Sequence, residues 1–181
     1  VALHVEIDEP TTEPSGVTVV FAHGYTLSLD SWVFQRRTFK AAGHRVVLWD
    51  QRGHGQSGES APEDATIKQL GQDLHDVIAT IVPEGPVALV GHSMGGMTVM
   101  SLAHQFPELL RERVVAVGLV ATSAGGEGLT DVDLGPAFGQ FVGRFGPVLL
   151  HRLNRYSGPL RRLRRFGRNL EDALVEHYSY D

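Results

Sequence analysis

The sequence has 181 residues, of which 42% are hydrophobic and 20% are charged, and its formal net charge at pH 7 is -5. This composition indicates a globular chain that is long enough for one sizeable core. The absence of cysteine excludes a disulfide framework and a thiolate metal site, and no apolar run approaches the ~20 residues that a membrane span requires.

Four short apolar runs have the pattern of strands. They are rich in β-branched residues and almost continuously apolar, which is typical of strands that are buried on both faces of a parallel sheet. The four runs are Val17 to Ala22, Arg45 to Asp50, Pro86 to Gly91 and Arg113 to Ala121. A further segment, LHVEI at residues 3–7, is expected to add an edge strand.

Helical patterns separate these strands. They span Ser31 to Ala42, Thr66 to Val82 and Met94 to Phe106. The middle one is the clearest, because its apolar residues form one stripe and a capping box from Thr66 to Gln69 begins it. The alternation of strand and helix predicts an α/β fold with a mostly parallel sheet and helices on both faces.

The pattern changes after Ala121. A glycine-rich stretch, TSAGGEGLTDVDLG, leads into a segment with helical periodicity from Pro136 onward. We therefore expect residues 1–125 to form the α/β core and residues 126–181 to form a helical layer that follows it.

Positive charge is concentrated in that second part. Residues 144–168 contain 8 arginines and no acidic residue, whereas residues 1–143 carry 8 basic and 17 acidic side chains. A basic segment can contact a membrane surface, but it is more often the solvated face of a helix, and we expect the latter here. No zinc spacing or RNA-binding motif accompanies it, so no nucleic-acid partner is predicted.

The stretch GHSMGG, residues 91–96, lies where a strand passes into a helix. In a very tight turn the apex residue, Ser93, takes a strained backbone conformation, and Gly91 and Gly95 two positions away must lack a Cβ. The serine then projects above the sheet beside the N–H groups of the helix N-terminus. This is the arrangement of a nucleophile elbow. The alternative interpretation is a glycine turn with a solvent-exposed serine.

A serine that transfers acyl groups needs N–H donors for the oxygen that becomes negative in the tetrahedral intermediate. We expect the backbone N–H of Met94 to be one donor and that of Tyr25, in the stretch FAHGYT, to be the other. His23 precedes this loop at a strand end. We expect it to shape the loop by hydrogen bonding and not to act as the general base.

The stretch DQRGHGQSG, residues 50–58, is formally a dinucleotide fingerprint, because Gly53, Gly55 and Gly58 have that spacing. However, the acidic loop ESAPEDA follows it, and the next helix begins only at Thr66. No helix N-terminus would therefore meet a pyrophosphate, and dinucleotide binding is not predicted.

The motifs HGYT, DQRGHGQS and GHSMGG, in this order and at these intervals, resemble the α/β-hydrolase family, and most of all its serine esterases and lipases. The resemblance implies a serine hydrolase that cleaves a hydrophobic carboxylic ester through an acyl-enzyme, with no metal or organic cofactor. It also implies that the helical stretch after Gly126 is the cap of the family. Phe138, Phe141 and Phe145 would line an acyl pocket there.

Other functions share these features. Cofactor-free haloperoxidases and carbon-carbon-bond hydrolases use the same serine, and a non-catalytic ligand-binding or scaffold protein would have the same fold. Members with an aspartate nucleophile are disfavoured, because Ser93 occupies the apex of the turn.

The family places its activating histidine and carboxylate after the cap, on the loops that follow the last two strands. We expect these two residues to come from a missing C-terminal segment or a second chain, and the strand at residues 114–120 to be an open edge without it. His151 and His177, which Asp181 follows, are the alternative bases. The sequence starts at Val1 with no initiator Met and no charged-then-apolar stretch, so we expect that any targeting segment was removed or never existed. The compartment stays open, with the cytoplasm favoured.

Overall fold

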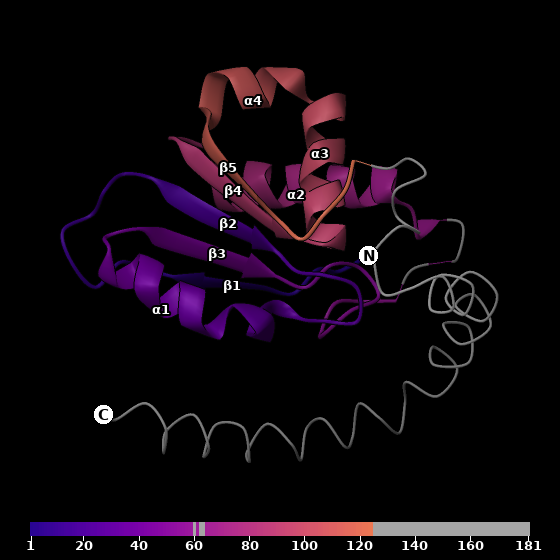
Figure 1. The fold of residues 1–181 in the computed structure, drawn as a ribbon, viewed down its shortest axis with the longest axis horizontal. Coiled ribbons are helices and arrows are strands. Elements are labelled where there is room, and N and C mark those ends of the chain that lie inside the picture. Colours follow the sequence, from indigo (N-terminus) through magenta and orange to yellow (C-terminus); the bar gives the residue numbers. More distant parts are fainter. Residues whose placement is uncertain (60, 62–63, 125–181) are drawn as a thin grey trace, which may run out of the picture. The chain divides into compact units, whose positions relative to one another are not determined.

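The computed structural model describes residues 1–59, 61 and 64–124 of the chain. These residues form a five-stranded sheet with helices on both faces (Figure 1). The strands are β1 (Val5–Asp8), β2 (Thr18–Ala22), β3 (Arg45–Trp49), β4 (Val87–His92) and β5 (Val114–Val120). The helices are the 3-10 helix η1 (Leu29–Trp32) and the α-helices α1 (Val33–Ala41), α2 (Ile67–Ile81), α3 (Met94–Gln105) and α4 (Pro107–Arg113).

The strand order in the sheet is β1-β3-β2-β4-β5. Strands β2 to β5 run parallel to their neighbours, and β1 pairs antiparallel with β3. The mostly parallel sheet and the added edge strand near the N-terminus are therefore confirmed. Within the described residues, no helix is long and apolar enough to cross a membrane.

Two apolar clusters form the core, one on each face of the sheet. Successive residues of a strand point to opposite faces, so Val20 belongs to one cluster and its neighbour Phe21 to the other. Helices α2 and α3 cover the first cluster with side chains that include Leu74 and Leu102. On the other face, η1 contributes Trp32, which packs against Phe21 with 4.9 Å between ring centroids. Figure 1 shows α1 on this second face.

The start of α2 differs in one respect from the predicted capping box. The side chain of Thr66 accepts a hydrogen bond from the backbone N–H of Gln69 at 3.1 Å, which is half of the box. The Gln69 side chain does not return to Thr66 but donates to Asp73 at 3.2 Å, one turn further along. The backbone N–H of Thr66 donates instead to the carbonyl of Asp64 at 2.9 Å. The prediction of a complete capping box was therefore wrong, because the Gln69 side chain and the N–H of Thr66 each have another partner.

Helix α4 was not predicted. The sequence pattern ends a helix at Phe106, and the chain does leave the helical conformation there, with ψ of 61°. Pro107 then begins a new helix, a position where its fixed φ and missing N–H are well tolerated.

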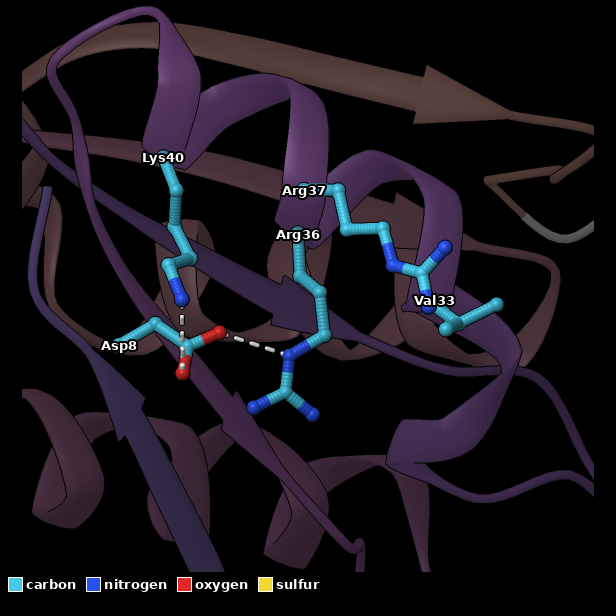
Figure 2. A pocket seen from close by; sticks show the side chains of 5 residues that line it. All are labelled: Asp8, Val33, Arg36, Arg37 and Lys40. Carbon is cyan, nitrogen blue, oxygen red and sulfur yellow. Dashed lines mark hydrogen bonds and ion pairs between the residues drawn. The ribbon is translucent and has the colours of Figure 1, made fainter. Parts of the chain in front are cut away.

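Ion pairs attach α1 to the edge strand β1 (Figure 2). The guanidinium of Arg36 donates to Asp8 at 2.7 Å and to Glu6 at 2.8 Å, and Lys40 lies 3.7 Å from Asp8. Hydrogen bonding to Arg36 keeps the pKa of Asp8 below its ordinary value. Asp8, Arg36 and Lys40 line a shallow hollow together with Val33 and Arg37. Asp8 forms ion pairs with both Arg36 and Lys40, so we interpret this cluster as a structural link between β1 and α1.

Several expectations fall outside the described residues. They concern the helical layer at 126–181, the basic segment at 144–168, the pocket residues Phe138, Phe141 and Phe145, and the residues His151, His177 and Asp181.

Strand β5 lies at one edge of the described sheet. Among the described strands it pairs only with β4, and its side chains are apolar and exposed. Val115 is 61% exposed, and Val117 and Leu119 are each 47% exposed. An edge of this kind is a template for pairing with another chain, because it lacks the charges and prolines that normally protect edges.

We expect the substitution Val117→Lys to raise the monomer fraction of the 181-residue chain at a given concentration, measured by sedimentation velocity. A charge on an edge strand opposes strand pairing. Ile67→Lys is the control, since Ile67 is also apolar and 37% exposed but lies on α2. Equal monomer fractions for the wild type and Val117→Lys would contradict the prediction.

Candidate active site

The candidate site lies at the carboxyl ends of the central strands. Because β2 and β4 pair in parallel, Ala22 at the end of β2 is in register with Gly91 of β4. The loop that follows β2, residues 23–27, therefore lies beside the turn from β4 into α3. Trp49, at the end of β3, is also in register with Ala22, which brings Asp50 and Gln51 to the same edge. This edge of an open α/β sheet is where ligands bind.

Ser93 occupies the apex of the turn between β4 and α3. Its φ of 52° and ψ of -117° lie in a region that non-glycine residues rarely adopt. Four hydrogen bonds hold its peptide groups. Its N–H donates to the carbonyl of Val120 at 2.9 Å. Its own carbonyl accepts from the N–H of Gly96 at 2.9 Å, from the N–H of Met97 at 3.2 Å and from the hydroxyl of Thr122 at 2.7 Å. Within the described residues the Ser93 hydroxyl has no hydrogen-bond partner.

The glycines on either side of Ser93 sit where no Cβ fits. A Cβ on Gly91 would overlap the carbonyl of Gly95, and a Cβ on Gly95 would overlap the carbonyl of Ala22. Both obstacles are backbone atoms, which cannot swing away as a flexible side chain can. The close approach of α3 to β2 and β4 therefore requires glycine at both positions.

The backbone N–H groups of Tyr25 and Met94 lie on the two segments that meet at this edge. Met94 is the first residue of α3, and Tyr25 is in the loop after β2. Among the described residues, neither N–H has a hydrogen-bond acceptor. The Tyr25 side chain is 46% exposed and contacts His54 edge to face, with 5.4 Å between ring centroids. The two N–H groups are thus available to an oxygen atom of a ligand.

His23 is completely buried under the loop. Its Nε2 accepts a hydrogen bond from the backbone N–H of Gln51 at 3.0 Å, so the proton of the neutral ring is on Nδ1, which donates to the carbonyl of Gly24 at 2.8 Å. Burial lowers the pKa of His23 to about 4. Both ring nitrogens are engaged and the ring is neutral at pH 7, so His23 shapes the loop and is not a general base for Ser93.

Three other described histidines contact neighbouring residues. His92 packs so closely on Gly24 that a Cβ there would lie 2.8 Å from its Nδ1. His54 is hydrogen-bonded to the carbonyl of Arg52 at 2.9 Å. His75 stacks on Phe106, with 3.9 Å between ring centroids. In the part of the chain that the structure describes, no histidine is hydrogen-bonded to Ser93.

Asp50 organises the glycine loop that resembles a dinucleotide fingerprint. Its buried carboxylate accepts hydrogen bonds from the N–H of Leu29 and the N–H of Gln56, both at 2.8 Å. Gly55 has a φ of +52°, and a Cβ there would overlap this carboxylate. The loop is thus wrapped around an acidic side chain, and α2 begins only at Ile67. Neither feature suits a pyrophosphate, so the loop is a structural element of the site.

Three positions in this site were not singled out from the sequence. Gln51 and Thr98 are buried and hydrogen-bonded to each other at 2.7 Å, and Thr122 holds the carbonyl of Ser93. Gln51 directly follows the predicted strand that ends at Asp50, and Thr122 directly follows the one that ends at Ala121. A polar residue at the carboxyl end of a parallel strand is the signal that could have identified Gln51 and Thr122. Thr98 lies within α3 and carries no such signal.

Comparisons with known proteins agree on the fold. A family model described as alpha/beta hydrolase fold matches residues 17–171. An sn-1-specific diacylglycerol lipase of Mus musculus is 36% identical over 122 residues, which cover 66% of this chain and 38% of the relative. A monoacylglycerol lipase of Mycolicibacterium smegmatis is 34% identical over 101 residues, 54% of this chain and 36% of the relative.

A solved structure of an esterase from Exiguobacterium antarcticum superposes with a TM-score of 0.54 at 25% identity, and the match covers 67% of this chain and 42% of that one. The matches to the first curated relatives span between 34% and 45% of those proteins. The chain therefore corresponds to less than half the length of these curated relatives.

We expect Gly95→Ala to lower the free energy of unfolding by about 2 kcal/mol or more, because the added methyl group overlaps the carbonyl of Ala22. Urea denaturation at neutral pH measures the effect. Gly118→Ala is the matched control, since the nearest atom to a Cβ there is 3.6 Å away. A Gly95→Ala protein as stable as the Gly118→Ala protein would refute the packing at the turn.

The low pKa of His23 predicts a loss of stability in acid. The folded ring has a pKa of about 4, whereas an unfolded histidine titrates near its ordinary value of 6.5. As the pH falls between these values, the unfolded chain binds a proton that the folded chain does not. The free energy of unfolding should then fall by up to about 1.4 kcal/mol per pH unit.

Denaturation curves recorded above pH 7 and near pH 5 test this expectation. His23→Gln removes the titrating ring and should reduce this part of the pH dependence. The prediction fails if both proteins lose the same stability between the two conditions.

Proposed function

The chain belongs to the α/β hydrolase family, whose esterase- and lipase-like members are among its relatives, and on this premise we propose that it carries the nucleophile of a serine hydrolase for hydrophobic carboxylic esters. The observation that supports the proposal most directly is the strained backbone of Ser93, with a φ of 52°, beside two N–H groups that have no acceptor among the described residues. Strain of this kind persists where the surrounding structure enforces it, and it is concentrated at functional sites.

In the proposed reaction the hydroxyl oxygen of Ser93 attacks the ester carbonyl. The carbonyl oxygen becomes negative and accepts hydrogen bonds from the N–H groups of Tyr25 and Met94. The N-terminus of α3 adds favourable electrostatics, because the partial positive charge of the helix dipole lies there. Collapse of the tetrahedral intermediate releases the alcohol and leaves an acyl group on Ser93. Water then attacks this acyl-enzyme and releases the acid.

The reaction needs a base that removes the proton of the Ser93 hydroxyl and gives it to the departing alcohol oxygen. In the second half the same base takes a proton from the attacking water and returns it to the oxygen of Ser93. We propose that a histidine and its Asp or Glu partner come from a segment beyond these 181 residues or from a second chain. Two observations support this origin: none of the described histidines is hydrogen-bonded to Ser93, and the chain matches less than half of its relatives' length. His151 and His177 are the alternative candidates, and both lie outside the described residues.

The proposed substrates are hydrophobic esters, because the two relatives named above are lipases of acylglycerols. We propose that Phe138, Phe141 and Phe145 supply an apolar pocket for the acyl group. These three residues belong to the part of the chain proposed as the cap.

We expect Ser93→Ala, in the complete protein that contains this chain, to lower kcat for a p-nitrophenyl ester by about 10³-fold or more. The substitution removes the nucleophile but keeps the Cβ and leaves the turn intact, so the free energy of unfolding should change by no more than about 1 kcal/mol. Labelling by a fluorophosphonate probe should be lost in parallel.

Ser101→Ala is the matched control for this experiment, because Ser101 is a serine on the same helix that accepts a hydrogen bond from Gln105 at 3.1 Å. It should leave both kcat and labelling unchanged. Ester turnover that survives Ser93→Ala would rule out the proposed nucleophile, and wild-type protein that neither labels nor hydrolyses esters would favour a non-catalytic role.

A further inference from the structure

We propose that Gln51 is a positioning residue for the two N–H donors of the site, and that its side-chain amide sets the distance between the loop that carries Tyr25 and the helix that carries Met94. The inference rests on the proposed function, because it assigns to Gln51 a role in stabilising the oxyanion. Gln51 is completely buried and, in the described part of the chain, has no hydrogen bond to Ser93, so the proposed function does not by itself require it.

The two donors belong to different elements, and this creates a problem of alignment. Each N–H must lie about 2.7–3.1 Å from the oxygen that it stabilises. Strand pairing aligns the two elements only as far as Ala22 and Gly91, because β2 ends at Ala22. Beyond that point, another interaction has to hold the loop against α3.

The side chain of Gln51 provides such an interaction. It is completely buried, its Nε2 donates to the carbonyl of His23 at 2.5 Å, and its Oε1 accepts from the hydroxyl of Thr98 at 2.7 Å. The orientation of the amide follows from its partners: a carbonyl can only accept, so the NH₂ group must face His23. The Gln51 amide therefore forms a bridge between His23, two positions before Tyr25, and Thr98 in the second turn of α3.

The helix end of this bridge reaches the second donor. The hydroxyl of Thr98 also lies 3.0 Å from the carbonyl of Met94, one turn earlier in α3. Its single hydrogen is shared between that carbonyl and Oε1 of Gln51, with the shorter distance to Gln51. The bridge thus attaches to the turn of α3 that begins with Met94.

The backbone of Gln51 controls the other donor through His23. Its N–H fixes the His23 ring, whose Nδ1–H holds the carbonyl of Gly24 at 2.8 Å. That carbonyl and the N–H of Tyr25 belong to one planar trans peptide, in which the two groups point in opposite directions. Holding the Gly24 carbonyl against the buried ring therefore turns the Tyr25 N–H away from the interior.

Packing alone does not require glutamine at this position. An apolar side chain of similar length, such as methionine, would fill the same volume. It would, however, leave the carbonyl of His23 and the hydroxyl of Thr98 without their shared partner, and the loop could then shift relative to α3. Displacements of about 1 Å in a site can reduce the rate about 10²-fold.

The test uses the complete protein that contains this chain and the steady-state hydrolysis of a p-nitrophenyl ester. We expect Gln51→Met to lower kcat by about 10- to 100-fold with KM changed less than about twofold, since the donors act mainly on the transition state. The affinity for an alkyl boronic acid, which forms a tetrahedral adduct with serine, should fall by the same factor as kcat/KM. A role in stability alone would not produce this proportionality.

Two further variants test the other end of the bridge. Thr98→Val removes the hydroxyl at nearly constant volume and should lower kcat by about 10-fold or more, whereas Thr98→Ser keeps the hydroxyl and should retain kcat within about threefold of wild type. Combining Gln51→Met with Thr98→Val should lower kcat no further than the more severe single substitution, because both break the same link.

The matched control is Gln105→Met. Gln105 is also a glutamine whose Nε2 donates to a backbone carbonyl, that of Lys68 at 2.8 Å, but it lies at the opposite end of α3. It should leave kcat and boronic acid affinity unchanged. A kcat for Gln51→Met within about twofold of this control would overturn the inference.

If Gln51→Met does not fold, the Thr98 pair decides: equal kcat values for Thr98→Val and Thr98→Ser overturn the inference, and unequal values in the expected order support it. A wild-type protein without Ser93-dependent hydrolysis overturns the proposed function and this inference with it. Ser93-dependent hydrolysis that the Gln51 and Thr98 variants leave unchanged overturns the inference alone.

Discussion

The parallel pairing of β2 with β4 is the constraint on which the rest of the site depends. The register that sets Ala22 beside Gly91 brings two segments together that are almost seventy positions apart in the sequence. It also explains the glycines, because α3 can start directly after β4 only if its first turn passes close to the carbonyl of Ala22. Steric exclusion at Gly95 and strain at Ser93 are thus two results of one strand register.

Where the strands end, buried polar side chains hold the loops in place by hydrogen bonds to their backbone. Past the last sheet hydrogen bond, the backbone groups of the loops need new partners, since an unpaired polar group in the interior is costly. The carboxylate of Asp50 accepts hydrogen bonds from the N–H groups of Leu29 and Gln56, and the side-chain amide of Gln51 donates to the carbonyl of His23. The two adjacent residues at the end of β3 therefore determine the shape of the loops on both sides of them.

Most of the fold could be predicted from the sequence, but only part of this hydrogen-bond network could. Strands such as β2 and β4 were predictable because a continuous apolar run is the direct mark of burial on both faces, and the turn at Ser93 because only glycine satisfies its sterics. Helix α4 and the partner of the Gln69 side chain were not, since both depend on neighbours that local pattern does not reveal. Gln51 is a single polar residue with no periodicity, so its two partners emerge only when the strands are arranged in space.

The hydrogen bonds from the end of β5 to the turn have a consequence for how the protein opens. Ser93 is held in its unusual conformation by the carbonyl of Val120 and the hydroxyl of Thr122, both at the end of the strand with the most exposed apolar side chains. In a native protein, poorly buried elements open more often than the core. Opening of β5 would release both bonds and leave the Ser93 carbonyl with its bonds from Gly96 and Met97, while the register of β2 with β4 would stay in place. The strained turn therefore depends on a poorly buried edge strand as well as on the buried pair β2 and β4.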